Sequence, residues 1–300
     1  MTMFKKWASI ALVALLAFAA IAVPAGSASA ETGSGKTVVT LGADLSQDQR
    51  QALLQEMGVD SNVQTINVGI NDIRKYLNTG SSNGPAPSDN KAYSSARITI
   101  MDGGNGIQVK AKNVTRVTEQ MYANALITAG IQDAQVYVTS PHPVTGTAAL
   151  TGVMMAFEKA TNKQISQDQR NVANEEMKQT SQLGQKVGGD KAADFMNQVK
   201  EEIAKQQPKS QDEVRDIVVN VGRDLNINLN NQDINNITNV MFQFSQLDNI
   251  DWSALQGQLQ GLKGDLQKNF QNIIDSPEAQ GFFDKLMNWI KDFFSSLFSG

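Results

Sequence analysis

The chain of 300 residues contains no cysteine and a single histidine, His142, and its formal net charge is −4. This composition excludes a cysteine nucleophile and a zinc site of Cys and His ligands within one chain, and it allows a Ser-His-Asp triad only through His142. The acidic balance argues against nucleic acid as a partner, because phosphates are bound by basic patches. We expect neither a cofactor nor a metal.

The first thirty residues have the pattern of a cleavable secretory signal peptide. Lys5 and Lys6 precede the apolar stretch Ala8–Val23, and small residues then lead to an A-x-A pattern at Ala28 and Ala30. Charge, apolar core and small-residue end follow each other in the order of a signal peptide. The alternative, a permanent anchor, needs about 20 apolar residues. We predict cleavage near Ala30 and a secreted or envelope-associated protein.

Residues 31–162 alternate between strand and helix patterns, which predicts an α/β sandwich on a mixed sheet. The short loop 102–106 further predicts that the two strands beside it pair as a hairpin. The expected strands are 36–41, 63–68, 94–101, 107–114 and 135–140. The expected helices lie between Ser46 and Gly58 and at 72–77, 118–129 and 147–160.

Residues 163–300 show no strand pattern and predict an all-helical second half, so the fold class is α+β. Ser166 with Gln169 and Ser210 with Glu213 have the spacing of capping boxes. The pentapeptide SQDQR opens expected helices at both 46–50 and 166–170, which we interpret as two uses of a good cap. The expected helices are 167–183, 190–206, 211–224, 231–246, 252–274 and 277–298.

The last expected helix, 277–298, is amphipathic, with aromatic and aliphatic residues over about half of its circumference. One interpretation is a helical hairpin in which this helix packs against 252–274. The other is a helix that lies on a membrane surface. The residues expected to contact the membrane or a partner are Phe282, Phe283, Trp289, Phe293 and Phe294.

The most site-like stretch runs from Tyr137 to Gly152 and reads as a strand, a hydroxyl-rich turn and a helix start. Free N–H groups at a helix start can bind an anion or a polar group. Alternatively, Thr147 caps the helix and Gly146 makes a tight turn. No residue of the chain is assigned a catalytic role. The candidate ligand-binding residues are Thr139, Ser140, His142, Thr145, Gly146 and Thr147.

Four stretches resemble the YpuA-like family of uncharacterised exported proteins of Gram-positive bacteria. They are VTLGADLS at 39–46, VYVTSPHPVTGTAALTG at 136–152, SQLGQKVG at 181–188 and IDW at 250–252. The resemblance spans the mature chain and implies an extracellular or cell-envelope protein. It implies no activity, ligand or catalytic residue.

These patterns predict an exported, non-catalytic protein that binds or organises an unknown envelope component or protein. One alternative is an extracellular hydrolase that uses two carboxylates on cell-wall material, since the 30 acidic residues leave such a pair open. Another alternative is a peripheral membrane protein held through residues 277–298.

Overall fold

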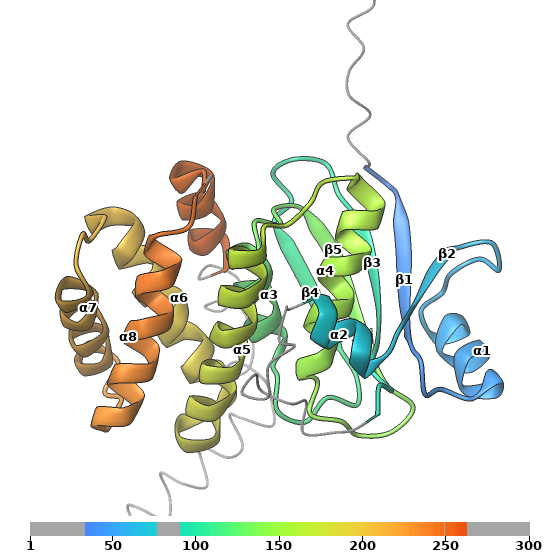
Figure 1. Cartoon of the computed structure of the whole chain (residues 1–300), viewed down its shortest axis with the longest axis horizontal. Coiled ribbons are helices and arrows are strands. Elements are labelled where there is room, and N and C mark those ends of the chain that lie inside the picture. Colours follow the sequence, from blue (N-terminus) through green and yellow to red (C-terminus); the bar gives the residue numbers. More distant parts are fainter. Residues whose placement is uncertain (1–33, 77–90, 249, 263–300) are drawn as a thin grey trace, which may run out of the picture. The chain divides into compact units, whose positions relative to one another are not determined.

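The computed structural model describes residues 34–76, 91–248 and 250–262 (Figure 1). The strands are β1 (Thr37–Gly42), β2 (Gln64–Val68), β3 (Ser95–Ile100), β4 (Ile107–Ala111) and β5 (Ala134–Thr139). The helices are α1 (Gln47–Glu56), α2 (Ile70–Tyr76), α3 (Glu119–Thr128), α4 (Thr147–Thr161), α5 (Gln167–Val187), α6 (Gly189–Gln206), α7 (Gln211–Asp224) and α8 (Asn231–Ser245). Residues 252–262 are also helical. The predicted α+β fold is confirmed. The predicted signal peptide and the helix 277–298 lie outside the described residues.

The five strands form one mixed sheet in the order β2-β1-β3-β5-β4. β1 is parallel to β2 and β4 is parallel to β5, whereas β3 is antiparallel to both of its neighbours. The sheet therefore consists of two β-α-β units, β1-α1-β2 and β4-α3-β5, on either side of β3.

The predicted hairpin of β3 and β4 is wrong, because β5 lies between these strands. The loop 102–106 crosses the start of β5: Met101 N–H donates to Asp133 O, and Ala134 N–H donates to Gly106 O, both at 3.1 Å. The loop spans two inter-strand spacings of about 4.8 Å instead of one. Apolar and polar residues alternate along β3 and β4 in the same way whether the two strands pair directly or have β5 between them. The sequence pattern therefore could not distinguish these two arrangements.

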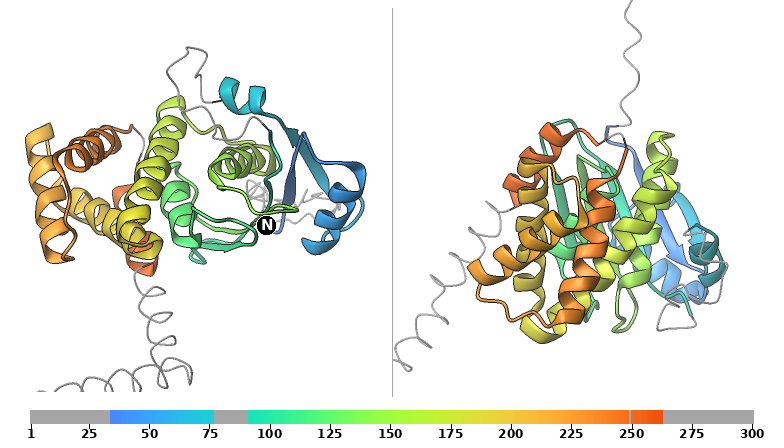
Figure 2. Two further views of the ribbon diagram at one scale, coloured as in Figure 1. Left: turned by 90° about the horizontal axis from the view of Figure 1, so that it is seen from below. Right: turned by 60° about the vertical axis from the view of Figure 1, so that its left-hand side comes forward.

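Helices cover the two faces of the sheet unequally (Figure 2). On one face Val38, Ile98 and Val136 belong to the large core shared with α3 and α4. On the other face Val39 and Leu41 form a small cluster with residues of α1. The outward positions of β4 and β5 beyond that cluster are largely polar and exposed.

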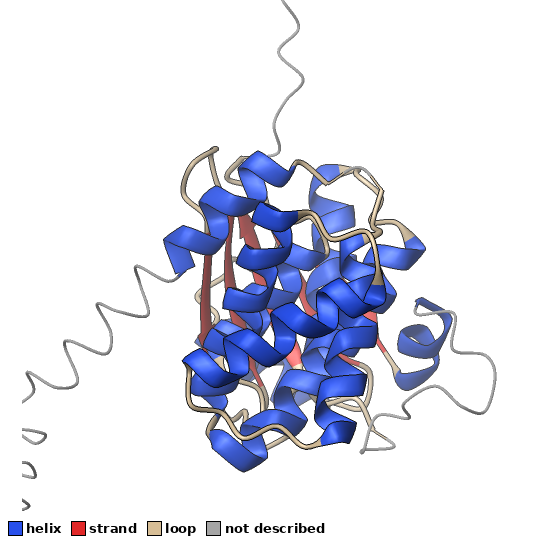
Figure 3. Cartoon of the chain, turned by 90° about the vertical axis from the view of Figure 1, so that its left-hand side faces the viewer, coloured by secondary structure: helices blue, strands red, loops and turns tan. Residues whose placement is uncertain are grey.

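The helices of the second half extend the large core away from the sheet. Seen from their side, they lie in front of the strands (Figure 3). α5 contacts α3, α4, α6 and α8, and α7 packs against α6 and α8. Buried residues from Val38 in β1 to Leu259 near the end of the described chain belong to one continuous cluster. The division of the chain at residue 162 stays a prediction.

Both SQDQR copies form the predicted capping boxes, with each serine as the N-cap. The arginine of each copy also reaches back across the helix start. Arg50 Nε donates to Leu45 O at 3.3 Å, and Arg170 Nε donates to Ile165 O at 3.0 Å. The motif thus satisfies a carbonyl outside the helix as well as N–H groups inside it.

The third predicted box is only half formed. Ser210 caps α7 by accepting from the N–H of Glu213. The Glu213 carboxylate accepts from the N–H of Lys209 at 2.6 Å, one residue earlier than a capping box requires. The helix start was therefore predicted correctly, and the reciprocal bond was not.

Candidate functional site

The predicted segment 139–147 connects β5 to α4. Thr139 and Ser140 are buried. Thr139 Oγ1 donates to Glu56 at 2.7 Å, and Ser140 O accepts from Asn113 Nδ2 at 2.7 Å. The side chains of Thr145 and Thr147 are half-buried and form no hydrogen bond with a described residue. The Ser140 hydroxyl is buried and has no hydrogen-bond partner among the described residues. Ligand binding at this segment stays a prediction.

Gly146 is the N-cap of α4, with φ +94°, and no side chain caps the helix. The alternative in which Thr147 caps α4 is therefore wrong, because Thr147 is the first helical residue. A Cβ at position 146 would lie 2.3 Å from Val114 Cγ1 and 2.7 Å from the Tyr122 hydroxyl. That hydroxyl donates to Gly146 O at 2.5 Å. Glycine is needed here both for its backbone conformation and for this close approach.

His142 is exposed and packs edge-to-face against the ring of Tyr93, with ring centroids 4.6 Å apart. It forms no hydrogen bond or ion pair with any described residue. A triad needs a histidine that is hydrogen-bonded to both a nucleophile and an acid. Within the described residues, no triad is assembled around His142.

Val144 holds the loop that precedes α3. Its N–H donates to Asn113 O at 3.0 Å, and its carbonyl accepts from the N–H of Thr115 at 2.9 Å. Together with the packing of Gly146 under Val114, these bonds fix residues 113–118. The segment singled out from the sequence therefore supports this loop, and the loop forms one wall of a groove.

The groove encloses about 790 Å³ where the loop before α3 meets the junction of α5 and α6. Its walls come from β4 and the loop, from the last turns of α5 and from the first turn of α6. Sequence reasoning missed this site, although SQLGQKVG at 181–188 was singled out and supplies part of it. The lining residues are Lys110, Ala111, Val114–Gln120, Ser181, Gly184, Gln185, Gly189 and Asp190.

Two glycines allow the floor of the groove to form. A Cβ on Gly189 would lie 2.5 Å from Thr118 Cγ2. A Cβ on Gly184 would lie 2.9 Å from Met121 Cε and 3.2 Å from the Cα of Gly189. The start of α3 can approach the α5–α6 junction this closely only because these positions lack side chains.

The polar groups of the groove are only partly matched by one another. At the rim, Glu119 pairs with the exposed Lys110 at 3.3 Å and accepts from the N–H of Ala111 at 3.1 Å. Arg116 and Asp190 are exposed, and neither side chain forms an ion pair or hydrogen bond with a described residue. Ser181 is 5% exposed, and its hydroxyl likewise has no such partner.

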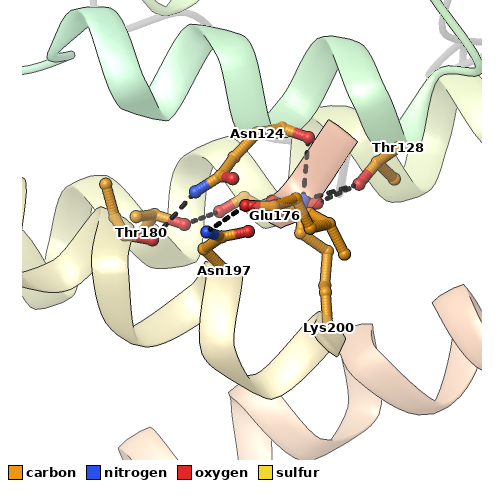
Figure 4. A network of polar contacts seen from close by, with 8 residues as sticks. Asn124, Thr128, Glu176, Thr180, Asn197 and Lys200 are labelled. Carbon is orange, nitrogen blue, oxygen red and sulfur yellow. Dashed lines mark hydrogen bonds and ion pairs between the residues drawn. The ribbon is translucent and has the colours of Figure 1, made fainter. Parts of the chain in front are cut away.

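A buried polar network joins the three helices whose ends surround the groove (Figure 4). Lys200 of α6 and Glu176 of α5 form an ion pair at 2.8 Å, with their side chains 0% and 1% exposed. Lys200 Nζ also donates to Asn124 O at 2.8 Å and to Thr128 Oγ1 at 3.2 Å, both in α3. Thr128 in turn donates to Glu176. Each charge thus has several partners, as buried ions require.

Burial lowers the pKa of Lys200, and the charge of Glu176 opposes this shift. The network ends at Thr180, whose Oγ1 donates to Glu176 O at 2.6 Å. The next residue in the chain, Ser181, lines the groove. Because α3, α5 and α6 share these bonds, their relative positions at the groove are fixed from within the core.

A second polar cluster lies on the open face of the sheet. The Glu56 carboxylate, at the end of α1, accepts from the Tyr137 hydroxyl at 2.9 Å, Thr139 Oγ1 at 2.7 Å and Lys112 Nζ at 2.7 Å. Partial burial raises the pKa of Glu56, but these bonds outweigh it, and the net pKa is lowered. A glycosidase acid needs a raised pKa, so Glu56 lacks that property.

In residues 34–76, 91–248 and 250–262, no three His, Cys, Asp or Glu side chains are grouped so that they could hold a metal ion. No helix in the same ranges is both long enough and apolar enough to cross a membrane. The predicted contact residues Phe282, Phe283, Trp289, Phe293 and Phe294 lie outside the described residues.

Together, the fold and the groove define an α+β protein with a polar cavity where a loop meets three helices. A family model described as "Protein of unknown function (DUF1002)" matches residues 41–262. The chain is also 38% identical over 271 residues to the uncharacterized protein YpuA of Bacillus subtilis (strain 168), which covers 90% of each chain. The chain therefore belongs to this YpuA-like family of unknown function, as the resemblance predicted. No solved structure matches it.

Proposed function

We propose that this protein is exported and acts at the cell envelope as a non-catalytic binding protein, with the groove as its ligand site. The main support is the groove itself, which combines a cavity of about 790 Å³ with unmatched polar groups on its walls. The volume lies within the range of small-molecule sites, about 300–1,000 Å³, and the lining is more polar than that of most such sites. The signal-peptide pattern of residues 1–30 supports the compartment.

Two groups that could serve in acid-base chemistry, His142 and Glu56, are not arranged for hydrolysis. His142 has no hydrogen-bonded acid or nucleophile, and the oxygens of Glu56 are occupied by three donors. Purified protein incubated with cell-wall material should therefore release no soluble fragments. Release of fragments above that from a heat-denatured sample would contradict the proposal.

Cell fractionation tests the compartment. The full chain, expressed in a Gram-positive host, should appear in the envelope fraction with a mass that lacks residues 1–30. Replacing Lys5 and Lys6 by glutamate should reduce export, because the positive start of the signal is lost. Uncleaved protein in the cytoplasm, or complete recovery in the medium, would overturn the envelope assignment.

A second arm asks how the protein is retained. Envelope retention through the groove should fall in the double variant Arg116→Gln/Asp190→Asn and should survive removal of residues 277–298. Retention that is lost only on removal of 277–298, together with flotation on liposomes that needs the same segment, would instead identify a membrane-surface protein.

A further inference from the structure

The groove presents opposite charges on two separate walls. Arg116 belongs to the loop before α3, and Asp190 belongs to the first turn of α6. They form no ion pair with each other or with any other described residue. Such exposed charges are solvated in the free protein, and a ligand of matching charge separation can replace this water with charge-assisted hydrogen bonds.

The same groove also presents uncharged hydrogen-bonding groups. Ser181 lines the groove and is 5% exposed, and its hydroxyl has no partner among the described residues. α6 begins at Gly189 after the N-cap Gly188, and no side chain caps its first N–H groups. These groups are suited to a carbonyl oxygen, which accepts hydrogen bonds without bringing a full charge.

The lining disfavours other ligand classes. Its charged residues are two cations and two anions, Lys110, Arg116, Glu119 and Asp190, so the lining offers no excess positive charge for a phosphate dianion. The lining also contains no aromatic ring on which a sugar could pack. Only a few lining residues, among them Ala111, Val114 and Val117, are apolar, so a purely apolar ligand would leave the polar walls unmatched.

We infer that the groove binds a short peptide with free amino and carboxyl ends. Arg116 holds the carboxylate with its planar guanidinium, Asp190 accepts from the ammonium group, and Ser181 with the start of α6 binds a peptide carbonyl. This inference rests on the proposed binding function and names its ligand class. It also gives a role to the SQLGQKVG segment, which contributes Ser181, Gly184 and Gln185 to the groove.

Equilibrium dialysis with purified mature protein tests this ligand class. The probe is a defined mixture of tripeptides in three forms: both ends free, amino end acetylated, or carboxyl end amidated. Free peptides should be retained, and blocking either end should weaken binding at least about 10-fold, since each block removes a charge-assisted hydrogen bond. No retention, or equal retention of free and blocked peptides, would overturn the inference.

Two single variants assign each peptide end to its wall. Arg116→Gln should remove the preference for a free carboxyl end and keep the preference for a free amino end. Asp190→Asn should have the converse effect. The matched controls are Arg223→Gln and Asp224→Asn, two exposed neighbours at the end of α7, and both should keep both preferences. Equal effects of groove and control variants would refute the assignment.

The experiments distinguish a failure of the peptide-ligand inference from a failure of the proposed envelope function. If no tripeptide is retained but the protein still fractionates with the envelope through its groove, the peptide ligand is refuted and the binding function stands. If tripeptides are retained but the protein is found only in the cytoplasm, the groove assignment stands and the envelope function falls.

Discussion

At the scale of single residues, Glu56 connects α1 to strand β5 and to the end of the edge strand β4. Its carboxylate accepts hydrogen bonds from Tyr137, Thr139 and Lys112, which lie on or just beyond strands β4 and β5. The ordinary pKa of the group is 4.5, and in the folded protein the pKa is lower. Stability that depends on these bonds must therefore depend on pH.

The sign follows from the direction of this shift. Well above pH 4.5 the carboxylate is ionised in both states, and its hydrogen bonds stabilise the folded protein fully. As the pH falls through the lower folded-state pKa, this contribution is lost. Glu56→Gln should reduce the free energy of unfolding by about 1 kcal/mol at pH 7 and by much less in acid. Urea unfolding at a series of pH values measures both.

The control for this prediction is Asp224→Asn, an exposed carboxylate without such a cluster. It should change stability little at any pH. Unfolding curves of wild type and Glu56→Gln that differ by the same amount at every pH would show that Glu56 acts through packing rather than through its charge.

Sequence patterns identified residues whose partners are three or four positions away. The serines of both SQDQR copies were recognised because a capping box depends only on local spacing. The groove was missed because its walls come from separate segments, and residues such as Arg116 and Asp190 become neighbours only in the fold. Gly184 and Gly189 gave no local signal either, since what matters is their approach to Met121 and Thr118.

At the scale of secondary-structure elements, α6 shows how burial can contradict composition. Lys200 is followed by two glutamates, and such a charged run normally lies on a solvated helix face. In the structure Lys200 is fully buried against Glu176 and α3. The boundaries of α6 could be predicted from the sequence, whereas its interior ion pair could not, because the partners lie on other helices.

Removing one member of this ion pair should be costly. Lys200→Met leaves Glu176 buried without its cation, which should reduce the free energy of unfolding by about 3–5 kcal/mol. The double variant Lys200→Met/Glu176→Leu should recover most of this loss, because apolar residues of similar volume can replace a buried pair. Urea midpoints of the three proteins measure the coupling.

The exposed pair Lys205–Glu202 provides the comparison for this cycle. Lys205→Met should cost less than about 1 kcal/mol, as surface ion pairs do. Additive losses at Lys200 and Glu176 would mean that the two side chains do not depend on each other, contrary to the network in Figure 4.

At the scale of the whole molecule, the continuous core predicts one cooperative unfolding transition for the described residues. Val138 in β5 and Phe244 in α8 are both fully buried in the same cluster. Trp252 packs edge-to-face on Phe244, with ring centroids 5.7 Å apart, and so reports on the helical end. Fluorescence of Trp252 in a chain of residues 31–300 with Trp289→Phe, which also lacks Trp7, should follow the same urea curve as far-UV circular dichroism.

Phe244→Ala sharpens this test, because it should lower the free energy of unfolding by about 3–5 kcal/mol through the cavity it leaves. Both signals should move to the same lower midpoint. Two separate transitions, with only the fluorescence signal shifted by the substitution, would show that the sheet and the helices unfold independently.

The position of β5 between β3 and β4 also sets an order for assembly of the sheet. The short loop 102–106 does not pair β3 with β4. β3 pairs instead with β5, which is synthesised only after β4 and α3. Bringing β3 and β5 together closes a longer loop of chain, and this costs entropy before the contacts between the strands form. A nascent chain that ends before Ala134 therefore lacks β5, so the second β-α-β unit is incomplete, and one side of β3 stays unpaired until β5 has been synthesised.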